Sequence, residues 1–401
     1  QDAIRGTFLG QNCSLRETRA LKLVRDHSEI YGCSLLSDGA TVHGCSLVNI
    51  LAGIPISLPP VMEIVDCTGH LASGGSKDSL FLTTEMIPVA EQIGSRNVYL
   101  YILDGASNER SSGEMLEEKY PWTTLLHGSE HLLSLAVGKV CKIPEFAELV
   151  EEHGEMYSWF THHQKPSAIF QKYAKQLNRG TGRKLTIMRA SPTRLAGNPI
   201  ALHKDLILKS ALIATVNSLE YKALALGIED ACVVKMCNDE FRWRAVKAFL
   251  MCTFPMVKLL RLVDSGSPTN GVLFSACLKF EEAIEYSREE LDDVIKRGDD
   301  EGSVYEEVLE GWGEYADELK HEWAKLGFVT NPLLIDEVLA YPDQQDLLAS
   351  SRRIVRKIFF GCEDMDRVLT EFSSSLSLFH DDAGGWDEAF IWNDPLLSQG
   401  K

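Results

Sequence analysis

Runs of apolar residues predict strands over the first third of the chain. Three short strand-like runs are separated by Gly, Pro or polar residues: Gly32–Ser37, Gly44–Ala52 and Val61–Asp66. The run Asn97–Leu103 is rich in β-branched and aromatic residues, which is typical of a strand buried on both faces. A further short strand is predicted over Trp122–Leu126.

Apolar residues at helical spacing predict helices before, between and after these strands, over Thr18–His27, Ser79–Ile93, Asn108–Lys119 and Ser129–Cys141. Pro88 lies inside the second of these helices and predicts a kink or a break there. From Thr18 onward the pattern is therefore a lead-in helix and then β-β-β-α-β-α-β-α, which indicates a mixed α/β sheet with helices on both faces.

The period changes after Pro144, because strand-like runs give way to helical spacing that is broken by Pro and Gly. We predict a lead-in helix over residues 1–30, the first part of an α/β core over 31–143 and an all-α domain over 144–360. Residues 361–401 are acidic and Ser-rich, and we expect from Glu363 onward a loosely ordered tail or a truncated return to the core.

Composition narrows the class of protein. The chain has 401 residues, is 45% hydrophobic and 24% charged, and lacks an apolar run long enough to span a membrane. The ten cysteines form no Cys-x-x-Cys pair and no zinc-finger spacing, so we expect no zinc site but reduced, buried thiols in an intracellular protein. Because the chain begins at Gln1, we expect it to be a fragment of a longer protein.

Charge is segregated along the chain, whose net charge is −18. From Gln164 to Lys209 ten basic side chains oppose one acid, Asp205, whereas from Glu281 to Glu322 17 acids oppose four basic residues. Either both segments are solvated helical faces, or the first is a surface for an anionic partner such as DNA and the second binds a protein or only faces water.

Two acids follow predicted strands at positions where a metal site can form. Asp38 follows the run CSLLS and Asp104 follows VYLYIL, so both can point into a crevice at the carboxyl ends of the strands. Carboxylates in such a place suit Mg²⁺ or Mn²⁺ and phosphoryl transfer. The alternative is structural, since Asp after a strand often forms a turn or caps a helix. Asp66 also follows a strand.

An ordered set of segments between residues 30 and 335 resembles the catalytic region of hAT-superfamily transposases, in particular a plant- and oomycete-type group with a domain of unknown function. The segments include LLSDGATVHG, YILDGASN, HGSEHLLSLAVGKV, ASPTRLAGNPI and KHEWAKLGFVTNPLL. The resemblance implies an RNase-H-like core interrupted by a large all-α insertion. It also implies that Asp38 and Asp104 are the first two catalytic acids and bind Mg²⁺ or Mn²⁺.

The chain departs from the family pattern at several positions. The third acid of the family is a Glu in a Cys-Glu-Arg-Asn-Trp-Ser-like motif, which is absent, and Glu363, Glu371 and Glu388 lack its surroundings. The Gly-Trp after the first acid is Gly39-Ala40 here, and the Cys-x-x-His motif keeps only its histidine, His131. The third acid is therefore unknown.

The family also suggests where DNA binds. Arg194 lies in a Thr-Arg-Leu sequence that is similar to a family signature, and Arg189 and Lys204 flank it in the basic segment. Arginine suits phosphate oxygens, so we expect these residues to bind DNA, with His131 on the DNA-facing side of the core; helix capping and packing are the alternatives.

Two hypotheses follow from the resemblance. The chain is either a domesticated, catalytically incomplete transposase-derived protein that binds DNA, or an active metal-dependent transposase whose third acid lies beyond this fragment. Both predict a nuclear or intracellular protein with no membrane association, and a dimer in the full-length parent. Trp243, Trp312 and Trp323 fall at apolar helical positions and are predicted core residues.

Overall fold

The computed structural model describes residues 18–55, 58–105, 107–177, 185–190, 196–224, 227–264, 269–294 and 302–380. The chain divides into two compact units. Unit 1 comprises Gln1–His131, Ser265–Ser275 and Glu318–Lys401, and unit 2 comprises Leu132–Asp264 and Ala276–Asp317. These compact units are not the predicted domains and do not test them. The predicted domain limits at residues 143 and 360 therefore stay predictions.

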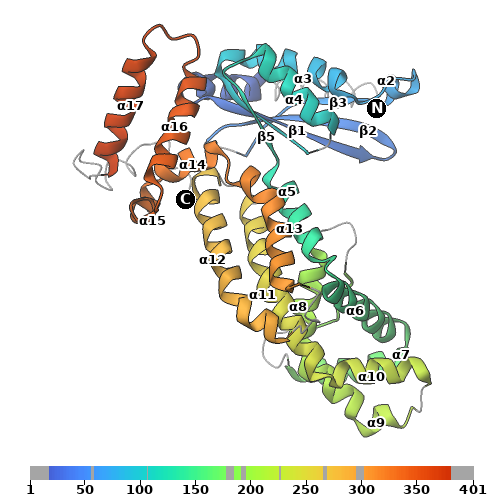
Figure 1. Cartoon of the computed structure of the whole chain (residues 1–401). Coiled ribbons are helices and arrows are strands. Elements are labelled where there is room, and N and C mark those ends of the chain that lie inside the picture. Colours follow the sequence, from blue (N-terminus) through green and yellow to red (C-terminus); the bar gives the residue numbers. More distant parts are fainter. Residues whose placement is uncertain are drawn as a thin grey trace. The chain divides into compact units, whose positions relative to one another are not determined.

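Unit 1 contains a mixed sheet of five strands in the order β3-β2-β1-β4-β5 (Figure 1). The strands are β1 (Cys33–Val42), β2 (Cys45–Gly53), β3 (Val61–Asp66), β4 (Val98–Leu103) and β5 (Thr124–His127). The first three are antiparallel neighbours, whereas β4 pairs in parallel with both β1 and β5. This is the RNase-H-like mixed sheet predicted for the chain.

The turn between β1 and β2 explains why β1 is longer than predicted. Val42 pairs with Cys45, and the two residues between them, His43 and Gly44, have φ angles of 50° and 83°. Positive φ at both central residues gives a two-residue turn whose twist matches that of the strands. The hairpin therefore extends β1 to Val42, beyond the predicted end at Ser37.

Helices cover the sheet and fill out unit 1. A helix over residues 18–31 precedes β1, and it is followed along the chain by α2 (Thr68–Ala72), α3 (Ser79–Ile93) and α4 (Ser107–Lys119). The apolar sides of the first helix, α3 and α4 join the sheet in one core, which includes Leu35, Ile50, Met86, Tyr101 and Leu116. The short α2 was not predicted.

Pro88 does not interrupt α3, although a break or kink was expected there. Met86, Val89, Ala90 and Ile93 of this helix are buried, so the apolar face on both sides of the proline is held against the core. Burial of several apolar side chains offsets the roughly 3 kcal/mol that a proline costs inside a helix.

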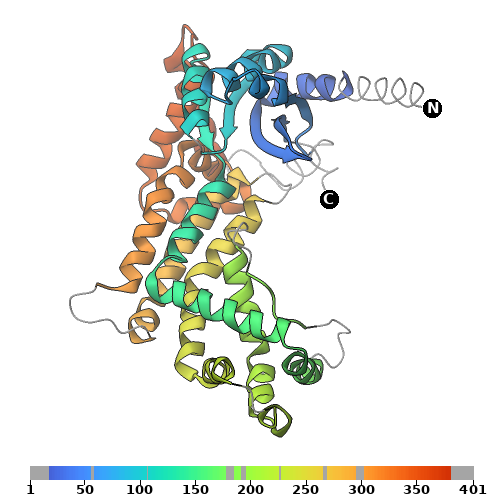
Figure 2. The ribbon, with the colours of Figure 1, turned by 90° about the vertical axis from the view of Figure 1, so that its right-hand side faces the viewer.

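The C-terminal part of unit 1 is helical. It comprises α14 (Glu322–Val329), α15 (Ile335–Ala340), α16 (Gln344–Ile358) and α17 (Met365–His380). Helices α16 and α17 contact each other (Figures 1 and 2), and Lys357 at the end of α16 donates to Glu117 of α4 and to the carbonyl of Thr123. The loosely ordered tail expected from Glu363 is thus wrong for the part that forms α17.

The described residues of unit 2 form helices and no strand. Its helices are α5 (Ser129–Val140), α6 (Pro144–His162), α7 (Gln164–Leu177), α8 (Gly197–Asn217), α9 (Leu219–Lys222), α10 (Ile228–Asn238), α11 (Glu240–Val263), α12 (Asn270–Val294) and α13 (Val304–Leu319). The first residues of α5 and α12 and the last of α13 belong to unit 1. One core of unit 2 includes Met156, Phe170, Leu212 and Trp243. None of the described helices is both long and apolar enough to cross a membrane.

Predictions about buried residues are confirmed in part. Trp243 and Trp312 are 2% exposed, whereas Trp323 is only partly buried. No disulfide forms among the nine described cysteines, but Cys45, Cys232 and Cys362 are exposed, which corrects the expectation that all are buried. Cys13 lies outside the described residues.

Candidate cation site at the carboxyl ends of strands β1 and β4

The two acids singled out in the sequence lie next to each other in the sheet. In the parallel pairing of β1 and β4, Ser37 is opposite Leu103, so the next residues along the chain are Asp38 and Asp104. Asp104 follows the last residue of β4, as predicted. Asp38 does not end its strand, because β1 continues in the hairpin, where Asp38 pairs with Asn49 of β2. It marks the end of the β1–β4 pairing instead.

Burial and charge act together on Asp38. Partial burial raises the pKa of its carboxyl, and the neighbouring negative charge of Asp104 raises it further, while a hydrogen bond from the Gly39 amide lowers it. A like charge held close by disfavours ionisation of Asp38, and a bound cation relieves that repulsion.

Glu109 is a third acid at this site, which sequence reasoning missed. It lies in the first turn of α4, and burial raises the pKa of its carboxyl to about 7, with further contributions from Asp104 and Asp38. The positive charge of Lys77 lowers the pKa of Glu109 and so opposes these effects. The Oε2 atom of Glu109 is buried and has no hydrogen-bond partner among the described residues. The sequence offered one indication of its role: Glu109 lies five residues after Asp104, at the start of the predicted helix that follows.

His131 lies beside Asp104. Its Nδ1 atom is 3.5 Å from Oδ1 of Asp104, and both side chains are partly exposed. The imidazole also lies beside Gly105, where a Cβ atom would be 3.4 Å from the Cδ2 atom of His131. The histidine predicted to face DNA is therefore close to the candidate catalytic acids.

The third acid is unknown from the sequence, and the glutamates near the family's position for it are not among the charges that act on Asp38. Glu371 of α17 forms an ion pair with Arg367 at 2.8 Å. Glu363 lies between α16 and α17, and Glu388 is outside the described residues.

The donor set of this site suits a hard, hydrated cation. Across the part of the chain that the structure describes, no three His, Cys, Asp or Glu side chains converge as metal ligands. Mg²⁺ keeps several waters and is bound in proteins through one or two carboxylates plus substrate phosphates, so the Asp38–Asp104 pair fits that ion.

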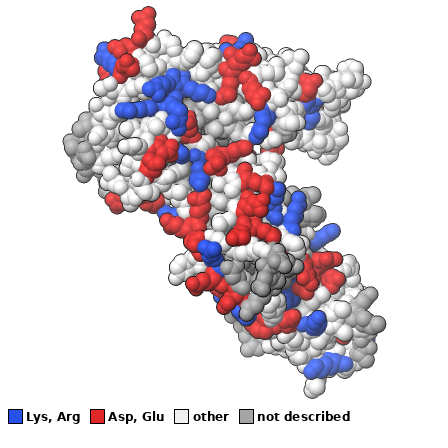
Figure 3. Space-filling view, in the orientation of Figure 1, with Lys and Arg blue, Asp and Glu red and all other residues white. Residues whose placement is uncertain are grey.

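The predicted DNA-binding residues of the basic segment lie in unit 2. Arg189 is exposed and Lys204 of α8 is partly buried, whereas Arg194 lies outside the described residues. Part of the positive charge is neutralised, because Lys172 pairs with Glu220 at 2.5 Å and Lys209 with Glu240 at 2.9 Å. Figure 3 shows basic and acidic side chains interspersed on the visible face of these helices.

The acidic segment is also engaged within unit 2. Glu290 pairs with Lys247 and Glu314 with Lys139, each at 2.8 Å, and Glu281 accepts a hydrogen bond from the indole of Trp312. These acids therefore connect helices of the unit as well as facing solvent.

A buried polar network in unit 2 was not predicted. His153 of α6 and Asp205 of α8 are almost fully buried and lie 2.6 Å apart, and the other ring nitrogen of His153 is 2.9 Å from the carbonyl of Met188. Arg242 of α11 is 4.0 Å from Asp205 and donates to Glu152 at 2.7 Å. Burial raises the pKa of Asp205, and His153 opposes this effect.

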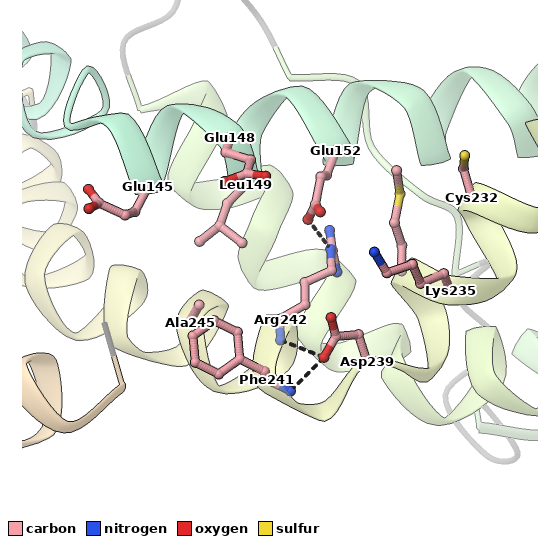
Figure 4. A pocket seen from close by; sticks show the side chains of 11 residues that line it. Glu145, Glu148, Leu149, Glu152, Cys232, Lys235, Asp239, Phe241, Arg242 and Ala245 are labelled. Atoms are coloured by element: carbon pink, nitrogen blue, oxygen red, sulfur yellow. Dashed lines mark hydrogen bonds and ion pairs between the residues drawn. The ribbon is translucent and has the colours of Figure 1, made fainter. Parts of the chain in front are cut away.

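A pocket of about 420 Å³ lies next to this network, and Glu152 and Arg242 belong to its lining (Figure 4). Asp239 accepts from the amides of Phe241 and Arg242 and so caps α11, while Glu152 holds the guanidinium of Arg242. Both acids act in helix packing, which is a structural role.

A comparison with models of known protein families finds no match for this chain, and a comparison with curated proteins finds no significant match.

Proposed function

We propose that this chain is a DNA-associated protein derived from a transposase of the hAT type, and that its Asp38–Asp104 pair binds a divalent cation against the phosphate backbone. The observation that carries this proposal is the parallel pairing of β1 and β4, which places the two acids side by side. The RNase-H-like strand order and the resemblance of the ordered segments support the same assignment.

The cation would be Mg²⁺ or Mn²⁺, held by the carboxylates of Asp38 and Asp104. When bound, such an ion neutralises phosphate charge and can activate an attacking oxygen. Two further residues flank the pair: Glu109, whose carboxyl has a pKa raised to about 7 by burial, and His131, which lies next to Asp104. DNA as the partner and a nuclear location follow from the family proposal.

A second candidate function is metal-dependent phosphodiester hydrolysis and strand transfer by the same pair of acids. Glu109 favours this candidate, because its carboxyl lies close enough to Asp38 and Asp104 for their charges to raise its pKa. The missing third-acid motif and the Gly39-Ala40 sequence favour the binding protein instead. We therefore rank the catalytically incomplete protein first.

Supercoiled plasmid and a labelled duplex, each with Mg²⁺ or Mn²⁺, distinguish the two functions. The binding proposal predicts duplex binding that weakens in EDTA and in Asp104→Asn, without nicking of the plasmid. Nicking by the unchanged protein that is lost in Asp104→Asn would establish the enzyme instead. Duplex binding that neither EDTA nor Asp104→Asn changes would refute a cation site at this pair.

A further inference from the structure

Lys77 lies beside the residue that follows Asp38. Its Nζ atom is 3.9 Å from the position that a Cβ atom on Gly39 would occupy, which is ordinary van der Waals distance. The ammonium group of Lys77 therefore lies beside the main chain of Gly39, one residue after Asp38. Lys77 comes from the segment between α2 and α3, and its residue is partly buried.

The main chain on both sides of Lys77 is held in place. The carbonyl of Lys77 accepts a hydrogen bond of 2.7 Å from Nδ2 of Asn108, in the first turn of α4. The next residue, Asp78, caps α3 by accepting from the amide of Phe81, and it also accepts from the hydroxyl of Ser76. The segment that carries Lys77 is thus tied to the start of both helices.

The ammonium group remains available to a ligand. Its charge acts on Glu109, where it opposes the effects of Asp38 and Asp104 on the pKa of that carboxyl. Nevertheless, the side chain of Lys77 forms no ion pair or hydrogen bond with any residue that the structure describes. Lys357 of the same unit is different, since it binds Glu117 and the carbonyl of Thr123.

We propose that Lys77 binds a phosphate oxygen of DNA at the Asp38–Asp104 site. The inference rests on the proposed function. A phosphodiester brought to the carboxylates of Asp38 and Asp104 meets repulsion, and the ammonium of Lys77 beside Gly39 offsets part of it. Lysine suits this task because its ammonium is a compact point charge that binds phosphate from several directions.

The test measures binding of a fluorescein-labelled duplex by fluorescence anisotropy in Mg²⁺, over a series of salt concentrations. Four proteins are compared: the unchanged chain, Lys77→Gln, Lys77→Arg and Lys22→Gln. Lys22 is exposed on the helix over residues 18–31, which precedes the opposite end of β1, so its substitution removes the same charge elsewhere. Circular dichroism confirms that each variant is folded.

Loss of one charged phosphate contact should weaken binding by about tenfold in Lys77→Gln. The slope of log affinity against log salt should fall by about 0.9, the value for one neutralised phosphate. Lys77→Arg should keep the slope, and Lys22→Gln should change neither quantity. An unchanged slope in Lys77→Gln, or an equal effect of Lys22→Gln, would overturn the role of Lys77.

Failure of the proposed function appears in a different measurement. If Asp104→Asn and EDTA leave duplex binding unchanged while Lys77→Gln lowers the slope, the cation site is wrong and the phosphate contact stands. If binding depends on the cation but Lys77→Gln has the salt slope of the unchanged chain, the cation site stands and the phosphate contact of Lys77 is wrong. Absence of duplex binding by the unchanged protein refutes both.

Discussion

Asp38 and Asp104 occupy the same level of two neighbouring parallel strands, immediately after the paired residues Ser37 and Leu103. The proximity is a property of the backbone, because hydrogen bonds between β1 and β4 set the register that brings the two acids together. Substitution of either carboxylate should therefore change the charge of the site and leave the strand pairing intact.

Replacement of Asp104 tests whether the pair binds a cation. Asp104→Asn should weaken Mn²⁺ binding at least about tenfold, because one of the two carboxylates is lost. Isothermal titration calorimetry or the electron paramagnetic resonance signal of free Mn²⁺ measures this affinity. Asp66→Asn is the matched control, since Asp66 also ends a strand but is exposed and accepts from the amide of Thr68. Equal losses in both variants would contradict a specific site.

Glu109 should make stability depend on pH. Because the pKa of its carboxyl is raised from 4.5 to about 7, the group is protonated in the folded protein and ionised in the unfolded chain over this interval. The stability that it contributes is complete below pH 4.5 and is lost as the pH rises through 7.

Glu109→Gln should therefore be more stable than the unchanged protein at pH 8, with a smaller gain at pH 5. The unscreened shift corresponds to about 3 kcal/mol, but Glu109 is only half-buried, so we expect about 1–2 kcal/mol. Urea unfolding at the two pH values measures the difference. Glu114→Gln, at an exposed position of the same helix, is the control, and an equal response of the two variants would argue against the raised pKa.

The buried pair in unit 2 should matter more than an exposed one. Asp205→Ala leaves His153 and Arg242 without their buried counter-charge and should cost about 3–5 kcal/mol of stability. Glu220→Gln breaks the exposed pair with Lys172 and should cost less than about 1 kcal/mol. Chemical denaturation of both variants measures the two losses of stability. Equal shifts of the two unfolding midpoints would contradict the prediction.

Two glycines with positive φ should respond differently to alanine. Gly32 has a φ of 72°, and a Cβ atom there would lie 2.1 Å from the ring of Tyr99, whereas Gly44 has a φ of 83° and open space around it. Gly44→Ala should cost about 1–2 kcal/mol from backbone strain alone. Gly32→Ala adds a clash and should cost about 1–3 kcal/mol more, as measured by thermal unfolding. Equal costs would show that Tyr99 moves freely.

Local patterns were sufficient for most elements of unit 1. The predicted helix Ser79–Ile93 has the observed bounds of α3, and β4 lies within the predicted run Asn97–Leu103. The end of β1 was wrong because the extension depends on pairing with β2 across the turn at Gly44, and the isolated run does not show this pairing. Pro88 was misjudged for a similar reason, since burial of its neighbours belongs to the tertiary structure.

The sequence by itself determined the order of the five strands and of the longer helices between them, and it pointed to Asp38 and Asp104, because periodicity and strand ends are properties of consecutive residues. Only the tertiary structure decided which strands are neighbours and so brought Glu109 and Lys77 to the same place as the two aspartates. The helix that carries Glu109 packs against the sheet, and the hydrogen bond from Asn108 to the carbonyl of Lys77 ties the segment that carries Lys77 to the start of that helix. Electrostatic interactions act through space, so their effects on these groups follow from that packing and not from spacing along the chain.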